Sequence, residues 1–236
     1  MTVRVGTAGW AIPQACRDQF PCSGSALERY ASRLNCAEIN TTFYRPHRPA
    51  TFERWAASTP AGFRFAVKIP RTITHERRLA GAADLLDPFL EMIAPLGDRL
   101  GPLLVQLPPT LIFGAQVTAG FLSALRRRHR GGIALEPRHS SWFDPEPERL
   151  LVDRGVARVA ADPARVPTAA EPGGAPRLRY WRLHGSPRMY WSAYPDDRLQ
   201  ALARVVAGSA DETWVIFDNT TSGAAAGDAL KLSGSL

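Results

Sequence analysis

Strand-like and helix-like segments alternate along the whole chain, and this alternation limits the fold more than any other feature. Apolar segments of strand length occur eight times, and helix-like patterns separate most of them. The predicted strands cover residues 3–7, 36–44, 63–69, 102–107, a segment starting at 133, 156–161, 178–184 and 213–217. Such an alternation is typical of α/β proteins with a parallel sheet.

Two α/β architectures fit this order, an open doubly wound sheet and a closed TIM-type (β/α)8 barrel. The count of eight strands, with polar residues at the carboxyl end of nearly every one, favours the barrel. We therefore predict one TIM-type barrel domain over residues 1–236. The segment 163–177 is rich in Pro, Ala and Gly, and it is predicted to be a loop in place of the helix between strands six and seven.

The sequence also excludes several classes of protein. It contains no G-x-G-x-x-G or G-x-x-x-x-G-K-[ST] nucleotide-binding motif and no run of about 18 uncharged apolar residues. Residues 1–6 lead directly into a strand pattern without a signal-peptide apolar region, so we expect a cytoplasmic protein without membrane contact. Because a closed barrel has no free sheet edge, a monomer without an obligate protein partner is the default expectation.

The stretch 133–142 marks the strongest candidate for a functional site. It begins as an apolar strand and then presents Glu136 and Arg138 at alternate positions, followed by His139 and Trp142. An unpaired buried charge is very costly, so this face of the strand is expected to meet a polar pocket. In TIM barrels the active site lies at the carboxyl ends of the strands.

Polar residues at the ends of the other strands are expected to converge on the same mouth. The predicted set is Glu38, Asn40, Lys68, Gln106, Glu136, Arg138, Asp162, Arg182, His184 and Asn219. Glu38 lies deeper, and a structural ion pair with Arg64 or Arg182 is an equal alternative for it. The aromatic residues Tyr44, Tyr190 and Tyr194 are expected near the rim, where they either contact a ligand or cover the mouth.

Three chemistries fit this set of residues. Lys68, Arg138 and Arg182 are suited to binding a phosphate or carboxylate. Glu136, Asp162 and His184 are suited to general acid–base catalysis, and the same groups leave a divalent metal open as an unknown cofactor. Lys68 is a further catalytic candidate, as a Schiff-base nucleophile, although nothing in the sequence marks its pKa as lowered. The spacing of histidines matches no metal motif, so no metal ligand is assigned.

The basic composition offers two interpretations. A net charge of +7 and a pI near 9.9 indicate an anionic partner, but nearly all the cations are arginines in a chain rich in Ala, Gly and Pro, which GC-rich coding also produces. Lysine occurs only at Lys68 and Lys231. A lysine retained at a strand end indicates that a compact or deprotonatable amine is needed there.

Several short motifs together resemble the YecE-like family, a domain of unknown function with a TIM-barrel-type fold. They are GTAGW at 6–10, EINTTFY at 38–44, Lys68 with Thr74–His75, QLPP at 106–109, EPRH at 136–139, RLHG at 182–185 and FDNT at 217–220. The resemblance covers nearly the whole chain and adds His75 to the predicted site. It implies no catalytic role for any residue. The short segment after Trp10 and the end at 232–236 depart from the family pattern.

Two functions remain as hypotheses. The first is an enzyme acting on a small phosphorylated or otherwise anionic substrate. In it, Lys68, Arg138 and Arg182 bind the anion, and Glu136 with His184 or Asp162 moves protons or holds a metal. Asn40, Tyr44, His75, Gln106, Tyr190, Tyr194 and Asn219 are predicted to contact the substrate. The second is a nucleic-acid-binding protein or phosphoester hydrolase, indicated by the basic balance and the loop 71–78.

Overall fold

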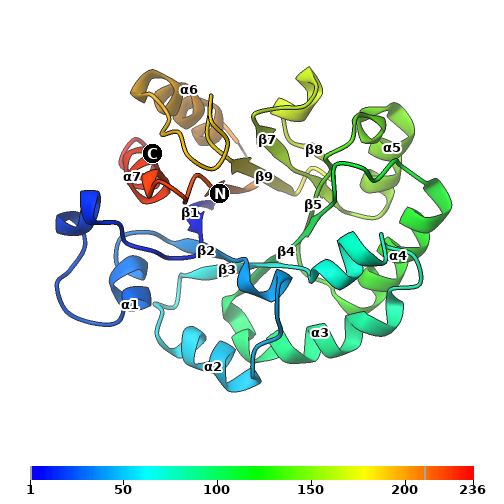
Figure 1. Cartoon of the computed structure of the whole chain (residues 1–236), viewed down its shortest axis with the longest axis horizontal. Coiled ribbons are helices and arrows are strands. Elements are labelled where there is room, and N and C mark those ends of the chain that lie inside the picture. The colour runs from blue at the N-terminus through cyan, green and yellow to red at the C-terminus, as the bar shows by residue number, and fades with distance from the viewer. Residues whose placement is uncertain (1, 210) are drawn as a thin grey trace.

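A computed structural model describes residues 2–209 and 211–236, and its strands form a nearly closed barrel surrounded by helices (Figure 1). The strands are β1 (Val3–Ala8), β2 (Cys36–Ile39), β3 (Arg64–Lys68), β4 (Leu100–Gln106), β5 (Ile133–Glu136), β6 (Ala157–Arg158), β7 (Ala160–Asp162), β8 (Gly173–Gly174), β9 (Leu178–Leu183) and β10 (Glu212–Phe217). The helices are α1 (Ala26–Ala31), α2 (Pro49–Ala57), α3 (Leu86–Ile93), α4 (Ala115–Arg128), α5 (Pro145–Asp153), α6 (Asp196–Ala207) and α7 (Ala224–Ser233).

One interrupted strand brings the two ends of the sheet together. The sheet order is β7-β9-β10-β1-β2-β3-β4-β5-β6-β8, and all pairings except β6 with β8 are parallel. β6 and β7 are separated only by Val159, yet β6 pairs with β5 and β7 pairs with β9. They therefore act as the sixth of eight barrel strands, which confirms the predicted TIM-type architecture.

The segment between the sixth and seventh barrel strands contains no α-helix among the described residues, as the sequence predicted. Residues 167–170 form a short 3₁₀ helix, and β8 pairs with β6 as an antiparallel extension. At the other end of the chain, α7 forms a helix of 10 residues. Within the described residues, no helix has the length and apolar character needed to cross a membrane.

The second strand is shorter than predicted. β2 ends at Ile39, and Thr41–Phe43 form a 3₁₀ turn instead of continuing the strand to residue 44. The hydroxyl of Thr42 is shared between the carbonyl oxygens of Ile39 (3.1 Å) and Lys68 (2.7 Å), which holds the turn against β3. This turn places the Phe43 ring beside the end of β3.

The barrel interior is apolar at its base and charged towards its mouth. The apolar layer consists of Cys36, Ala66, Leu104, Ala134, Ala157, Val159, Leu178, Tyr180, Trp214 and Ile216. Trp214 stacks on Tyr180 with centroids 6.1 Å apart, and a Cβ at Gly101 would lie 2.5 Å from the Trp214 ring. Glycine at this position therefore makes room for the indole that fills the base.

Candidate functional site

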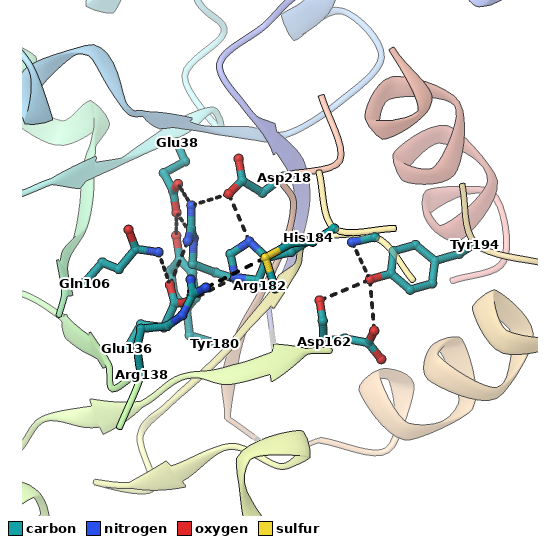
Figure 2. A network of polar contacts seen from close by, with 12 residues as sticks. Glu38, Gln106, Glu136, Arg138, Asp162, Tyr180, Arg182, His184, Tyr194 and Asp218 are labelled. Carbon is teal, nitrogen blue, oxygen red and sulfur yellow. Dashed lines mark hydrogen bonds and ion pairs between the residues drawn. The ribbon is translucent and has the colours of Figure 1, made fainter. Parts of the chain in front are cut away.

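Arg182 on β9 is the centre of a buried ion-pair network directly above the apolar layer (Figure 2). Its guanidinium donates to both oxygens of Glu38, at 2.7 and 3.1 Å. It also donates to Glu136 Oε2 at 2.7 Å and to Asp218 Oδ2 at 3.0 Å. Three strands thus direct carboxylates at one arginine, and this pairing offsets the cost of burying the charges. Glu38 thus forms its ion pair with Arg182, one of the two partners predicted from the sequence.

His184, two residues further along the chain, bridges two of these carboxylates. Its Nδ1 lies 3.0 Å from Asp218 Oδ2, and its Nε2 lies 3.0 Å from Glu136 Oε1. Both ring nitrogens must carry hydrogen for both contacts to be hydrogen bonds, which requires the imidazolium form. Burial opposes that charge, but the Glu136 carboxylate and the two hydrogen bonds raise the pKa of His184.

Glu136 is fully enclosed by its hydrogen-bond donors. Oε1 accepts from His184 and from Arg138 Nη1 (3.2 Å), and Oε2 accepts from Arg182 and from Gln106 Nε2 (2.9 Å). Burial alone would raise the pKa of Glu136, but Arg182 and His184 hold it well below the usual range. A general base must reach the proton that it removes, and here four donors surround the Glu136 carboxylate at the floor of the site.

The charges within this group balance. We call it the Arg182 network, and its charged members are Glu38, Glu136, Asp218, Arg138, Arg182 and His184. With His184 protonated, three carboxylates face three cations. The network is therefore neutral, and any further cation beside it is uncompensated.

A cavity of about 500 Å³ lies at the mouth of the barrel beside this network. Its walls are Asn40, Phe43, Tyr44, Lys68, Arg71, His75, Gln106, Tyr190, Asp218, Thr220 and Thr221. We call it the mouth cavity. It collects six of the predicted site residues, and its volume suits a small-molecule ligand.

Lys68, at the end of β3, is the uncompensated cation of the mouth cavity. Its Nζ lies 4.1 Å from the centroid of the Phe43 ring, and no carboxylate of the described residues forms an ion pair with it. Burial, followed by the charge of Arg182, lowers the pKa of Lys68 to about 8. The amine therefore titrates close to neutral pH.

His75 lies on a π-helical turn, Thr72–Glu76, that follows β3. Its Nδ1 is 2.9 Å from the Thr74 hydroxyl, and its ring meets Phe43 edge to face at 4.9 Å. Burial and the positive charges of Lys68 and Arg71 lower the pKa of His75. This imidazole is neutral at pH 7 and can accept or donate a proton at the cavity wall.

Tyr190 closes the opposite wall. Its backbone has φ of 64°, in the left-handed region that residues other than glycine rarely adopt. Its ring lies edge to face with His184, with centroids 5.5 Å apart. Strain of this kind persists only where the surrounding structure enforces it, and here it holds the phenol ring over the Arg182 network.

The placement of Asp162 and Tyr194 at the mouth needs correction. Ala161 is in register with Arg182 and Asp162 with Leu183, so the Asp162 side chain points outward. It contacts Arg198 of α6, and its Oδ1 lies 3.3 Å from the Tyr194 hydroxyl. Figure 2 shows these two residues as a group separate from the Arg182 network. Tyr194 is buried there, and its hydroxyl accepts from the Gly185 amide at 2.8 Å.

Asn219 also turns away from the mouth. Its amide donates to Asp228 of α7 at 2.7 Å and to the Ser192 carbonyl at 2.9 Å. The neighbouring Asp218 takes the mouth position that the sequence analysis gave to Asn219. Trp214 and Ile216 of β10 face the interior, and the alternation of the strand extends to Asp218.

The donor groups do not form a metal site in the described part of the chain. No three His, Cys, Asp or Glu side chains within residues 2–209 and 211–236 are arranged to hold a metal ion. In the Arg182 network, the carboxylates are directed at Arg182, Arg138 and His184. Those contacts occupy most of the carboxylate lone pairs that a metal would need.

The fold and the charged mouth define a TIM-type barrel with a candidate ligand site at the usual end. The family model described as "Protein of unknown function DUF72" matches residues 4–236, and the chain belongs to this family. The UPF0759 protein YecE of Escherichia coli (strain K12) is 35% identical over 178 residues, which cover 72% of this chain and 62% of YecE. The match thus spans less than two thirds of that relative.

Solved structures show the same fold. A DUF72 family protein of Thermotoga maritima MSB8 is 26% identical, with a TM-score of 0.80, and the alignment covers 99% of this chain and 98% of that one. A D-psicose 3-epimerase is 12% identical, with a TM-score of 0.56, and the alignment covers 97% of this chain and 89% of that one. At that identity the likeness concerns the fold alone, which enzymes share.

Proposed function

We propose that the protein is an enzyme that binds a small anionic, typically phosphorylated, substrate in the mouth cavity and moves protons on it. The observation that carries the proposal is Lys68, an uncompensated cation that lines a cavity beside a neutral network. Since the Arg182 network needs no further charge, an anionic ligand is the missing partner of Lys68.

The groups that meet the substrate differ from those expected at first. Arg182 is enclosed, so anion binding falls to Lys68 and Arg71. Arg71 pairs with Glu76 at 3.1 Å, but both side chains are more than half exposed, and such a pair is weak enough to exchange for a ligand.

Proton transfer in this proposal belongs to groups on the cavity wall. Lys68 has a pKa of about 8, and His75 is neutral at pH 7, so both are suited to exchange protons near neutral pH. Asp218 lines the cavity as well, and Arg182 and His184 keep its pKa low against the effect of burial. Glu136 and His184 then act as positioning residues that fix Asp218 and Arg182.

The test is a thermal-shift screen of phosphorylated metabolites and inorganic sulfate, followed by ³¹P NMR of the compounds that bind. We expect several anions to stabilise the wild type, Lys68→Met to abolish the shift, and at least one bound compound to be converted. Lys231→Met is the matched control, because its amine is exposed and paired with Asp196. Equal shifts in wild type and Lys68→Met would reject the proposal.

Nucleic-acid binding is the weaker alternative. The arginines of the loop 71–78 contact their own neighbourhood, since Arg77 pairs with Asp84 and Arg78 donates to Thr110. A fluorescent oligonucleotide titrated at low salt distinguishes the two, because nucleic-acid binding weakens steeply with salt. A cytoplasmic location and a monomeric state belong to the same proposal, and a divalent metal as cofactor stays open.

A further inference from the structure

Lys68 has a chemical property that anion binding does not require. Arginine supplies all but two of the 29 basic side chains of this sequence, and it binds phosphate with better geometry than lysine. A guanidinium cannot be deprotonated in a protein, whereas an amine can become a nucleophile. The lysine at the cavity wall is therefore informative about the reaction itself.

The surroundings of Lys68 leave its amine free to react. Glu38, Glu136 and Asp218 are engaged by Arg182 and His184, so among residues 2–209 and 211–236 no carboxylate holds the ammonium in an ion pair. Lys68 is 7% exposed and lines the mouth cavity, so a ligand in the cavity reaches its side chain while most of the residue is shielded from solvent. Such partial desolvation is one way in which a lysine nucleophile is activated.

We propose that Lys68 forms an imine with the carbonyl carbon of a small anionic aldehyde or ketone bound in the mouth cavity. The proposal rests on the function proposed above and adds the substrate class, a carbonyl compound, and the covalent step. The neutral amine attacks the carbonyl carbon, and the C=O π electrons move to the oxygen. A proton passes from nitrogen to oxygen to give a carbinolamine. Its hydroxyl then accepts one proton from solvent and leaves as water while the nitrogen lone pair forms the C=N bond, which gives the protonated imine.

The cavity supplies what this step needs. His75 lines the same cavity in its neutral form, so it can take up a solvent proton and deliver it to the departing hydroxyl, which leaves the imine protonated. The Phe43 face, 4.1 Å from Nζ, stabilises a cation, and the protonated imine is a cation at the same place. The network member Asp218 also lines the cavity and provides a fixed negative charge there.

The two lysines of the chain form a natural comparison. Burial lowers the pKa of Lys68 to about 8, whereas the hydrogen bond to Asp196 raises that of Lys231. At pH 7.5 a measurable fraction of Lys68 is neutral, and almost none of Lys231 is. A reagent that requires a neutral amine therefore discriminates between them.

The experiment incubates the full chain with glyceraldehyde 3-phosphate and sodium cyanoborohydride at pH 7.5 and maps the reduced adducts by peptide mass spectrometry. We expect Lys68 to be modified at least about tenfold faster than Lys231, because a larger fraction of its amine is neutral. Free sulfate should slow the modification of Lys68 and leave that of Lys231 unchanged. Neutral glyceraldehyde should modify Lys68 more slowly than the phosphorylated aldehyde does.

Lys68→Arg separates this inference from the proposed function, because it keeps the cation and removes the nucleophile. We expect it to retain sulfate binding and to lose the adduct. Sulfate binding by both proteins with Lys68 modified no faster than Lys231 would overturn the imine and leave the anion site in place. Fast modification of Lys68 by both aldehydes without any sulfate binding would reject the anionic substrate while supporting a reactive amine.

Discussion

The mouth of the barrel contains two polar regions that look alike in sequence and differ in structure. The Arg182 network is buried, and its carboxylates and cations bond to one another. The wall of the mouth cavity is partly exposed, and its amine at Lys68 forms no ion pair with a carboxylate in the described part of the chain. Clustered charges such as the Arg182 network can therefore stabilise the fold without binding a ligand. The Lys68 amine, which forms no ion pair within the described residues, is the better indicator of the ligand.

The largest expected effect tests whether the network is structural. Replacing Arg182 with Met leaves Glu38 and Glu136 buried without their main partner, so the free energy of unfolding should fall by about 3–5 kcal/mol. Urea denaturation followed by circular dichroism measures it. Adding Glu38→Gln and Glu136→Gln should restore part of the loss. Arg77→Met, which breaks an exposed pair, is the control, and an equal loss in both single variants would contradict this role.

The second effect separates stability from binding at Lys68. The folded pKa of about 8 lies below the ordinary value of 10.5, so the wild type bears the full cost of a buried ammonium below pH 8. Lys68→Met should therefore raise the free energy of unfolding at pH 7 by about 1–3 kcal/mol while it weakens sulfate binding at least tenfold. The gain should disappear between pH 8 and 10.5. If Lys68→Met were instead less stable than the wild type at pH 7, the claim that Lys68 is a buried cation without an ion-pair partner would be wrong.

A third, smaller effect concerns the charge of His184. Its pKa is raised in the fold, so its contribution to stability is fully present below pH 6.5 and is lost as the pH rises through the folded pKa. The stability difference between wild type and His184→Gln, measured by urea denaturation from pH 5 to 9, should therefore shrink with rising pH. His129→Gln should show the opposite trend, because burial lowers the pKa of His129. A difference that stays constant or grows with rising pH would contradict the raised pKa of His184.

The smallest effect concerns the outward-facing Asp162. Its carboxylate contacts the exposed Arg198 of α6, so Asp162→Asn should change the free energy of unfolding by no more than about 1 kcal/mol. Isothermal titration calorimetry should give an unchanged sulfate affinity. A marked loss of sulfate affinity would show that Asp162 contributes to the mouth cavity. It would contradict the separation of Asp162 from the ligand site.

The sequence predicts the barrel well because each strand and helix has a local apolar pattern. It does not tell which face of a doubly buried strand looks inward. Val156–Ala161 is apolar except for Arg158, and Thr213–Phe217 is apolar except for Thr213, so little alternation guided the choice of Asp162 and of Asn219 over Asp218. Only the register across β9 decides these positions.

The site itself was predictable in its location and less so in its roles. Glu136, Arg182 and His184 stood out as charges on buried strands, and the structure does bring them together. These side chains satisfy one another's hydrogen bonds through long-range contacts. Arg182 and Glu136 are 46 positions apart in the sequence, and His184 and Glu136 are 48 apart, so no local pattern predicts the contacts. The lowered pKa of Lys68 likewise arises from burial and from Arg182, on a different strand.

The most direct measurement is the sulfate affinity of the wild type and Lys68→Arg by calorimetry at pH 7 and pH 9.5, a range over which sulfate does not titrate. If Lys68 is the cation that binds the ligand, the wild-type affinity should fall by about tenfold as the amine, with its pKa of about 8, loses its proton. The Lys68→Arg affinity should stay nearly constant. A wild-type affinity that is the same at both pH values, or no sulfate binding at pH 7, would contradict an anion site built on Lys68.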